Sequence, residues 1–395
     1  MKPTLLFITN RFVIGGPAFH VADLARRLQS DFDVFIIGGE AAKGEMNNLT
    51  IFYGLKNEPI LLPDFSRRFN LINDIKSYFS IKKYIRQLNP LIVHTHTGKP
   101  GVLGRYAAYK LNVKVIVHTY HGHLFRGYFN SFLTKWIIWL DRKMVRYSSA
   151  IIALTQNQKK DLVEIFQIAP AEKVHIILPG LQIERFGFKE KAREKFRHRF
   201  HIDAQCLALG IVGRLVDIKN VKLFLRGIKM LRKEGFRVKG IVVGDGPEKR
   251  HLKDYCLSLG LSFAEFSVGT QDESVIFTSW QKDLTKVYSG LDGLALTSEN
   301  EGAPYSLMEA QLIGLPIIAS KVGGVEDIVL DKETGLLFES EAEFFQHLRL
   351  WASDADLRKK LASNAQNFAR KTFNADRMAL ETQNLYEKLI MSKPS

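Results

Sequence analysis

The chain has 395 residues, 46% of them hydrophobic, and is long enough to bury two ordinary hydrophobic cores. No apolar run approaches the length of a membrane span, and Cys206 and Cys256 provide neither a disulfide framework nor a metal-ligand spacing. The net charge of +15 lies mostly in residues 1–185, which hold 25 Lys and Arg against 13 Asp and Glu. The N-terminus reads as a strand that enters a loop, not as a cleaved signal. We therefore expect a cytoplasmic protein with buried thiols and a basic first half.

Short apolar runs alternate with helical patterns along almost the whole chain. In the first half, strands are predicted at 4–9, 34–38, 91–95, 114–120, 150–154 and 174–178. In the second half, they are predicted at 207–213, 238–244, 274–278, 293–297 and 316–320. Continuous apolar strands separated by helices indicate parallel sheets that are covered on both faces. The sequence therefore predicts an α/β protein with two doubly wound parallel sheets.

The boundary between the two sheets is predicted just after Pro179 and Gly180, where a charged helix follows. The expected domains are residues 1–185 and 186–371, and a C-terminal helix in residues 372–395 is expected to pack back on the first domain. Residues 259–274 read as a long loop.

The loops after strands are the candidate sites, because doubly wound sheets bind ligands beyond the carboxyl ends of their strands. After the first strand, Gly15 and Gly16 precede Pro17 at a helix start, where backbone amides and the helix dipole favour an anionic group. This loop lacks the three spaced glycines of a dinucleotide site. The segment HTHTGKPG contributes His96 and Lys99 beside a glycine-rich turn, a candidate site for an acceptor phosphate.

Two loops in the second half combine opposite charges. In VGRLVDIKN, Arg214 is predicted to end a strand and Lys219 to open the next helix. In SENEGAPYSLMEAQLIG, Glu301 precedes a helix that Pro304 is predicted to begin, and Glu309 lies inside it on an apolar stripe, where a carboxylate needs hydrogen-bond donors. Solvated cations and a capping glutamate are the alternative. Cations for a diphosphate and carboxylates for hydroxyls suit a nucleotide sugar.

Together with Gly15-Gly16, YHGH at 120–123 and VGDGPE at 243–248, these two loops resemble the retaining glycosyltransferases of family 4, which have the GT-B fold. The match covers nearly the whole chain in the family's order. The resemblance implies two Rossmann-like domains that face a cleft, the first on the acceptor side and the second binding the nucleotide sugar.

The resemblance also implies a role for each motif residue. Arg214 and Lys219 match the positions that bind the donor diphosphate. Glu301 matches the carboxylate that holds hydroxyls of the transferred sugar, and Glu309 the one that binds the ribose diol. The further donor-binding positions are Gly15, Gly16, Gly302, Ala303 and Tyr305. The nucleotide would then supply the donors that Glu309 needs.

His121 matches the histidine near the transferred sugar, although His118 and His123 leave this assignment open, and a core histidine is the alternative for each. Pro304 departs from the family, because it lacks the N–H that members often place there. No metal and no cofactor are implied: the Asp-x-Asp motifs at 31–33 and 354–356 read as caps or solvated faces.

We therefore expect an enzyme that moves a hexose or N-acetylhexosamine from a nucleotide diphosphate sugar, with UDP favoured, to a glycan or lipid-linked acceptor in cell-surface polysaccharide synthesis. A nonhydrolysing sugar-nucleotide epimerase and a non-catalytic polyanion-binding or membrane-binding protein are the alternatives. Neither a zinc-finger spacing nor an RNA-binding signature supports a nucleic-acid partner.

Segments 65–88 and 124–147 interleave basic and aromatic residues at helical spacing, which predicts contact with an anionic membrane surface at the inner face of the cell membrane. Ordinary amphipathic helices with a solvated basic face are the alternative. On the membrane interpretation, Arg67, Arg68, Lys82 and Lys83 contribute to binding.

Overall fold

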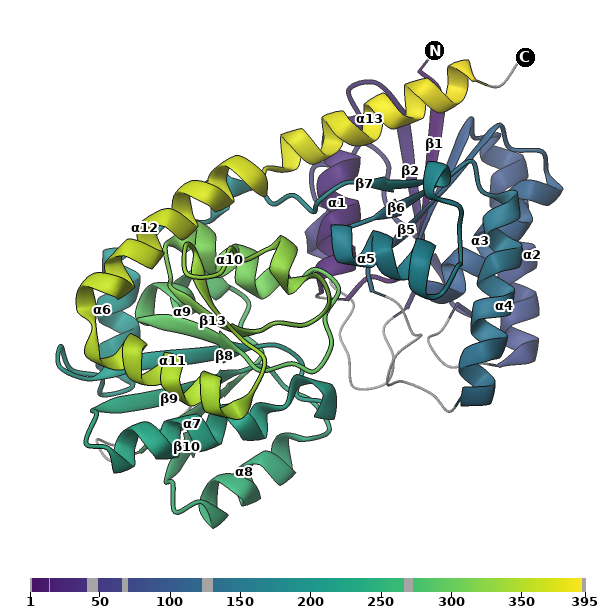
Figure 1. Ribbon diagram of the computed structural model, residues 1–395. Helices are drawn as coiled ribbons and strands as arrows, with labels where there is room; N and C mark the ends of the chain where they lie inside the picture. Colours follow the sequence, from purple (N-terminus) through teal and green to yellow (C-terminus); the bar gives the residue numbers. More distant parts are fainter. Residues whose placement is uncertain are drawn as a thin grey trace. The chain divides into compact units, whose positions relative to one another are not determined.

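The computed structural model describes residues 2–13, 15–40, 49–65, 70–122, 131–265 and 273–392. The chain divides into two compact units (Figure 1). Unit 1 comprises residues 1–181 and 373–395, and unit 2 comprises residues 182–372. Each unit is an α/β body built on its own seven-stranded parallel sheet.

The sheet of unit 1 has the order β3-β2-β1-β4-β5-β6-β7. Its strands are β1 (Thr4–Arg11), β2 (Asp33–Gly39), β3 (Ile60–Leu62), β4 (Ile92–His96), β5 (Val115–Tyr120), β6 (Ala150–Ala153) and β7 (Val174–Ile176). The central strands are buried on both faces, as continuous apolar runs require. The order reverses between β1 and β4, the position where open sheets bind ligands.

The helices of unit 1 are α1 (Gly16–Leu28), α2 (Leu71–Leu88), α3 (Gly98–Lys110), α4 (Ser131–Tyr147), α5 (Gln156–Lys160) and α13 (Ala375–Met391). Helices α2 and α4 both pack against α3 and lie with it on one side of the sheet (Figure 1). On α2, Asn70 caps the first turn by accepting a hydrogen bond from the Asn73 N–H at 3.1 Å, and the left-handed Asn89 ends the helix.

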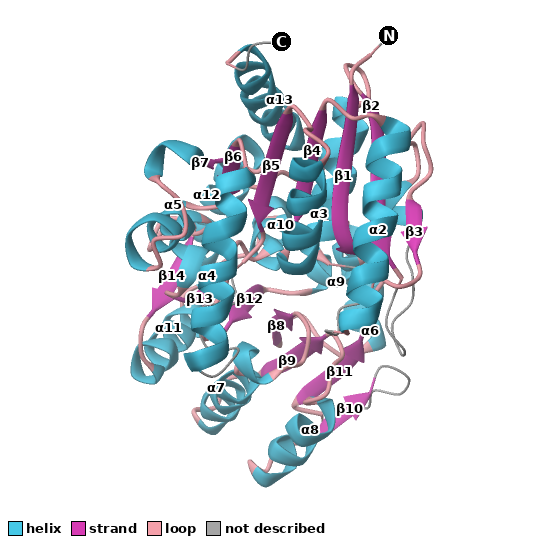
Figure 2. Ribbon diagram, turned by 90° about the vertical axis from the view of Figure 1, so that its right-hand side faces the viewer, coloured by secondary structure: helices cyan, strands magenta, loops and turns pink. Residues whose placement is uncertain are grey.

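The sheet of unit 2 has the order β10-β11-β9-β8-β12-β13-β14 (Figure 2). Its strands are β8 (Leu207–Val212), β9 (Val238–Val243), β10 (Phe263–Glu265), β11 (Val275–Ser279), β12 (Gly293–Leu296), β13 (Ile317–Ser320) and β14 (Gly335–Phe338). Its helices are α6 (Glu190–Arg199), α7 (Val221–Lys233), α8 (Lys249–Ser258), α9 (Leu284–Gly290), α10 (Tyr305–Ile313), α11 (Glu341–Ser353) and α12 (Ala355–Thr372). On α7, the buried residues include Val221, Leu225 and Ile228. Their spacing of four and three residues places them on one face of the helix, which packs on the sheet.

The prediction of two parallel sheets in an α/β chain is confirmed, and both cysteines are buried free thiols. Three short edge strands, β3, β10 and β14, were not predicted. Strand β10 lies within residues 259–274, so reading that whole segment as a loop was wrong, and residues 266–272 lie outside the described part. Edge strands are short and have only one neighbour, so their sequences carry little periodic signal.

Two helix boundaries also differ from expectation. Pro304 caps α10 in an extended conformation and the helix begins at Tyr305, so placing Pro304 at the first helical position was wrong by one residue. The C-terminal helical tail breaks at Phe373 and Asn374, where the Asn374 side chain caps α13. Helix α12 belongs to unit 2, whereas α13 belongs to unit 1 and packs against α1.

Candidate functional site

Three of the predicted donor-site residues gather at the carboxyl edge of the sheet in unit 2. Arg214 follows β8, Lys219 ends a short 3-10 helix (Asp217–Lys219), and Glu301 lies in the loop between β12 and α10. Lys219 Nζ forms an ion pair with the Glu301 carboxylate, to which Ser298 Oγ also donates at 2.6 Å. Lys219 therefore neutralises Glu301 and positions it. Reading Lys219 as the opening of α7 was slightly wrong, because α7 begins two residues later.

The two charged loops are tied together by hydrogen bonds to backbone carbonyls. Thr297 Oγ1 donates to the carbonyl oxygens of Lys219 and Asn220 at 3.0 and 2.9 Å, and the Glu299 N–H donates to the Ile218 carbonyl at 2.8 Å. These bonds hold the Lys219 loop against the Glu301 loop before any ligand binds. Such preorganisation suits the recognition of a charged ligand.

Two glycines let further loops pack closely against the Arg214 loop and the Glu301 loop. Gly244, the first glycine of VGDGPE, has a φ of +134°, and a Cβ there would lie 1.9 Å from the Gly213 carbonyl oxygen beside Arg214. Gly323 has a φ of +53°, and its Cβ would lie 1.9 Å from the Glu301 carbonyl oxygen. A side chain at either position would push the glycine's own loop away from that carbonyl oxygen. The Gly-x-Gly segment therefore packs directly against the loop that carries Arg214.

Arg214 differs from Lys219 in having no carboxylate partner among the described residues of unit 2. Its side chain is exposed. It lines a small cavity together with Gly213, Lys219 and Ser298. An exposed guanidinium beside a neutralised Lys-Glu pair leaves a local surplus of positive charge, which favours an anionic ligand.

Glu309 lies inside α10 and is 7% exposed. Its Oε2 accepts a hydrogen bond at 2.8 Å from the hydroxyl of Tyr288 on α9, so the protein itself supplies one of the donors that the sequence analysis assigned to the nucleotide. Burial raises the pKa of the Glu309 carboxyl to about 7, against the lowering effects of the Tyr288 bond and of Arg185. Tyr288 lies 21 residues away in sequence, and no local pattern marks it as the partner.

The raised pKa predicts a pH-dependent stability. The folded chain holds the Glu309 proton more tightly than the unfolded chain, whose carboxyl keeps its ordinary pKa of 4.5. The resulting stabilisation is present below about pH 4.5 and is lost as the pH rises to about 7, a change of at most about 3 kcal/mol. The free energy of unfolding can be measured by chemical denaturation at about pH 5 and about pH 8. The change in this free energy between the two pH values should be smaller for Glu309→Gln than for the wild type. Identical differences for the two proteins would contradict the burial effect.

In unit 1, Gly15 caps the N-terminus of α1 and is followed by Gly16 and Pro17. Among the described residues, no atom lies within 4 Å of the position that a Gly15 Cβ would take, and its backbone is extended. The protein's own packing therefore does not require a glycine here. Open space beside the positive end of a helix suits a ligand.

Three histidines from different parts of the chain meet near the carboxyl edge of the sheet in unit 1. His121 follows β5 and is partly buried, with its Nε2 2.9 Å from Nδ1 of His96 at the end of β4. The ring of His20, on α1, lies edge-on to the His121 ring with centroids 4.8 Å apart. His20 was not singled out in the sequence, although it lies four residues after Gly16 on the buried face of α1. Burial lowers the pKa of all three rings, and neighbouring histidines lower those of His96 and His121 further, so the rings are neutral near pH 7.

The other candidate residues of unit 1 do not join this histidine group in the described structure. His118 is buried in the core, with Nδ1 2.8 Å from Thr95 Oγ1 and its ring against Gly101, so the structure favours the core interpretation for it. His123 lies outside the described residues. Lys99, a candidate for the acceptor phosphate, forms an ion pair with Asp74 of α2 at 2.5 Å, so its charge is already balanced inside unit 1.

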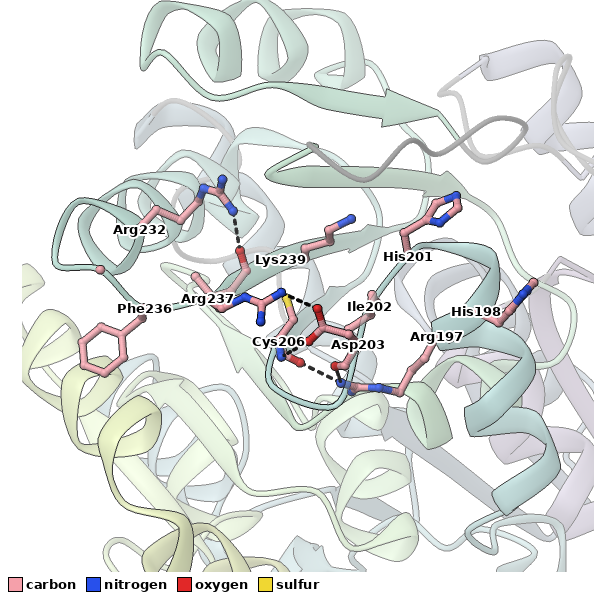
Figure 3. A pocket seen from close by; sticks show the side chains of 12 residues that line it. Arg197, His198, His201, Ile202, Asp203, Cys206, Arg232, Phe236, Arg237 and Lys239 are labelled. Atoms are coloured by element: carbon pink, nitrogen blue, oxygen red, sulfur yellow. Dashed lines mark hydrogen bonds and ion pairs between the residues drawn. The ribbon is translucent and has the colours of Figure 1, made fainter.

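A cavity of about 730 Å³ lies at the opposite, amino edge of the sheet in unit 2 (Figure 3). Its cations are already engaged: Arg197 pairs with Asp292, Arg237 pairs with Asp203, and Lys239 donates to the Phe200 carbonyl at 2.9 Å. These groups also lie at the end of the sheet away from Arg214. We therefore place the candidate site at the carboxyl edge.

Comparison with known families decides the class of protein. The family description "Glycosyltransferase Family 4" matches residues 14–185, and "Glycosyl transferases group 1" matches residues 192–368. Together, the two matches span most of both units. The chain belongs to glycosyltransferase family 4. It is therefore an enzyme, and the predicted membership of this family is confirmed.

Relatives of this family-4 glycosyltransferase cover nearly its whole length. An Escherichia coli protein named UDP-Gal:alpha-D-GlcNAc-diphosphoundecaprenol alpha-1,3-galactosyltransferase is 26% identical over 373 residues, which are 92% of this chain and 90% of the relative. The capsular polysaccharide biosynthesis glycosyltransferase CapM of Staphylococcus aureus is 22% identical over 85% of this chain and 86% of its own.

Solved structures establish the GT-B fold of this glycosyltransferase. Anabaena Alr3699/HepE, solved with UDP and glucose, superposes with a TM-score of 0.82 at 18% identity and covers 98% of this chain and 100% of its own. WaaG, a glycosyltransferase involved in lipopolysaccharide biosynthesis, has a TM-score of 0.72 at 18% identity and covers 97% of this chain and 99% of its own.

Proposed function

We propose that this family-4 glycosyltransferase moves a hexose or N-acetylhexosamine from a UDP-sugar to a glycan or lipid-linked acceptor, with retention at the anomeric carbon. The observation that carries the proposal is the group of Arg214, Lys219 and Glu301 at the carboxyl edge of the sheet in unit 2. UDP is favoured as the nucleotide because the E. coli relative is named for UDP-galactose and HepE was solved with UDP. The name of that relative also supports a lipid diphosphate as the acceptor carrier.

In the proposed reaction, the bond between the anomeric carbon and the donor's diphosphate oxygen breaks. The acceptor hydroxyl bonds to the same carbon on the same face, and a phosphate oxygen of the leaving UDP takes the acceptor proton. Arg214 and Lys219 would stabilise the charge that develops on the diphosphate, an effect that is strongest for preorganised groups. Binding of the diphosphate gives Lys219 a second anionic partner beside Glu301.

The remaining site residues would hold the two ends of the donor. Glu301 would accept hydrogen bonds from hydroxyls of the transferred sugar, beside the backbone of Gly302, Ala303 and Tyr305. The Glu309 carboxylate would receive the ribose hydroxyls while Tyr288 holds its other oxygen. In unit 1, Gly15 and Gly16 would let the backbone approach the donor, and His121 would contact the sugar.

Incubation of the purified enzyme with a panel of UDP- and GDP-sugars tests this proposal. Slow release of free nucleotide, without a new sugar nucleotide, is expected for a transferase that lacks its acceptor. A new sugar nucleotide would instead indicate the epimerase alternative, and absence of binding would indicate the polyanion-binding alternative. With an acceptor supplied, NMR of the product's anomeric proton distinguishes retention from inversion.

We also propose that unit 1 binds the cytoplasmic leaflet of the cell membrane, where a lipid-linked acceptor resides. Large apolar side chains are exposed in the first halves of α2 and α4, and both helices begin at the carboxyl edge of the sheet. On α2 these are Leu71, Ile72, Ile75 and Phe79, and on α4 they are Phe132, Trp136 and Trp139. Phe132 is 82% exposed, and the Lys143 ammonium lies 3.8 Å from the centroid of the Trp139 ring. Apolar side chains beside basic residues suit a monotopic surface contact.

The membrane proposal concerns a surface contact, since no helix in the described ranges is long and apolar enough to cross a bilayer. Of the four basic residues singled out in the sequence, Lys82 and Lys83 lie on α2, whereas Arg67 and Arg68 lie outside the described residues. Lysines near an anionic leaflet each contribute about 1 kcal/mol to binding.

Vesicles that contain anionic lipid should bind the wild type at low ionic strength and release it as salt is added. Neutralising Arg67, Arg68, Lys82 and Lys83 together should weaken this binding. Replacing Phe132, Trp136 and Trp139 together by serine should weaken it even at low salt, because the apolar contribution is not screened. Trp280→Ser is the matched control, since Trp280 is 53% exposed in unit 2. Failure of the wild type to bind at low salt would overturn the membrane proposal and leave the transferase proposal standing.

A further inference from the structure

The buried histidine group of unit 1 is not explained by the fold or by the proposed contact between His121 and the sugar. His96, at the end of β4, is fully buried, and His20, on α1, is 2% exposed. His94, the neighbour of this group, is satisfied on both sides, by Tyr386 Oη at 2.5 Å and Thr119 Oγ1 at 2.7 Å. The His96–His121 pair lacks such an arrangement.

The contact between His96 and His121 leaves polar atoms without partners. Nδ1 of His96 and Nε2 of His121 face each other at 2.9 Å, a distance at which one of them carries the proton. Across the described residues, Nε2 of His96 and Nδ1 of His121 are buried with no hydrogen-bond partner. In either tautomer, the pair buries one ring N–H and one lone pair, which is unfavourable. The protein's own packing therefore leaves this histidine pair incompletely satisfied.

One nitrogen from each of His20, His96 and His121 lies within 4.8 Å of the other two. Three imidazole nitrogens bound to one tetrahedral Zn²⁺ lie about 3.4 Å apart, since each Zn–N bond is about 2.0–2.1 Å long. Reaching that spacing requires each ring to move by less than about 1 Å.

We propose that His20, His96 and His121 form a three-histidine site for one divalent transition-metal ion of the zinc type. Imidazole ligands favour Zn²⁺, Co²⁺, Ni²⁺ and Cu²⁺ over Mg²⁺ and Ca²⁺, which prefer oxygen. Three protein ligands leave a fourth coordination position open for water or another oxygen. The two Asp-x-Asp motifs do not compete for this role in the structure, because Asp354 caps α12 and Asp33 accepts a hydrogen bond from Asn57.

Ion binding at this site has a consequence that rests on the proposed function. A metal bound to His121 would compete with the sugar that His121 is proposed to contact. The ion would therefore inhibit transfer, and a chelator would relieve the inhibition. The binding test below measures the ion directly, so it is independent of whether the transferase proposal holds.

Untagged, full-length enzyme titrated with Co²⁺ should develop the visible absorption of a tetrahedral Co²⁺ site, saturate at one ion per chain, and lose the band when Zn²⁺ is added. Loss of an outer-sphere partner typically lowers metal affinity by about tenfold to hundredfold. His96→Ala removes a direct ligand, so it should lower the Co²⁺ affinity by at least as much. His20→Gln should have the same effect, and it keeps a polar amide on α1. This variant replaces His96→Ala in the test if circular dichroism shows that His96→Ala does not fold.

His198→Ala and His201→Ala are the controls, because these exposed histidines line the separate cavity in unit 2. Unchanged Co²⁺ binding in both controls is expected. Absence of the tetrahedral band in the wild type would overturn the proposal. So would binding that survives His20→Gln and His96→Ala but falls with either control.

Discussion

Replacing Arg214 by alanine is expected to reduce the turnover number of sugar transfer by about a hundredfold, the scale for loss of one preorganised charge partner in a transition state. Arg214 is exposed and has no carboxylate partner in the described part of unit 2, so its removal should leave the free energy of unfolding nearly unchanged. The loss would then report its contact with the donor diphosphate.

Lys219→Ala should cost about as much turnover as Arg214→Ala, but with a different effect on the folded protein. Removing Lys219 leaves the Glu301 carboxylate with Ser298 as its remaining side-chain donor, so some stability should be lost as well. Steady-state kinetics with a UDP-sugar, together with chemical denaturation, measures both quantities.

The matched controls are Arg370→Ala and Lys371→Ala, which remove exposed cations of α12 in the same unit. Neither control should change turnover. Normal transfer by both Arg214→Ala and Lys219→Ala would refute the diphosphate assignment. A similar loss in the controls would attribute the effect to the net charge of unit 2.

Glu301→Gln is expected to reduce kcat/KM by about tenfold to a hundredfold, the range for a hydrogen bond to a charged group. Glutamine has the same shape but lacks the charge, so the sugar hydroxyls lose a strong acceptor and Lys219 loses its counter-ion. UDP binding measured by calorimetry should fall much less than transfer, because UDP lacks the sugar that Glu301 is proposed to hold. In Arg214→Ala, by contrast, UDP binding should fall as well.

Glu333→Gln is the control for this change, since Glu333 is an exposed glutamate of unit 2. If Glu301→Gln weakens UDP binding as strongly as it slows transfer, then Glu301 acts on the nucleotide and not on the sugar. If it changes neither quantity, the sugar-binding role fails while the Arg214 test remains unaffected.

Much of the site could be predicted from short segments of sequence. Arg214 and Lys219 lie five residues apart in one loop, and Glu301 and Glu309 lie eight apart across the start of one helix. In a parallel sheet, the loops that follow the strands lie at one edge, so placing both loops at that edge needed only the strand pattern. That β8 and β12 are neighbours follows from the order of the sheet. Because each motif lies within a short segment, the family resemblance could also be recognised from the sequence.

The sequence by itself determined the two-sheet α/β architecture, because buried parallel strands are continuous apolar runs that the chain repeats between helices. Only the tertiary structure decided which side chains pair. Lys219 meets Glu301 across 82 residues, and Glu309 meets Tyr288 through a hydroxyl on another helix. His20 and His121 likewise meet only in the folded chain, because four strands, β2 to β5, separate them in sequence. Such contacts depend on how separate elements are packed, and packing leaves no periodic trace along the chain.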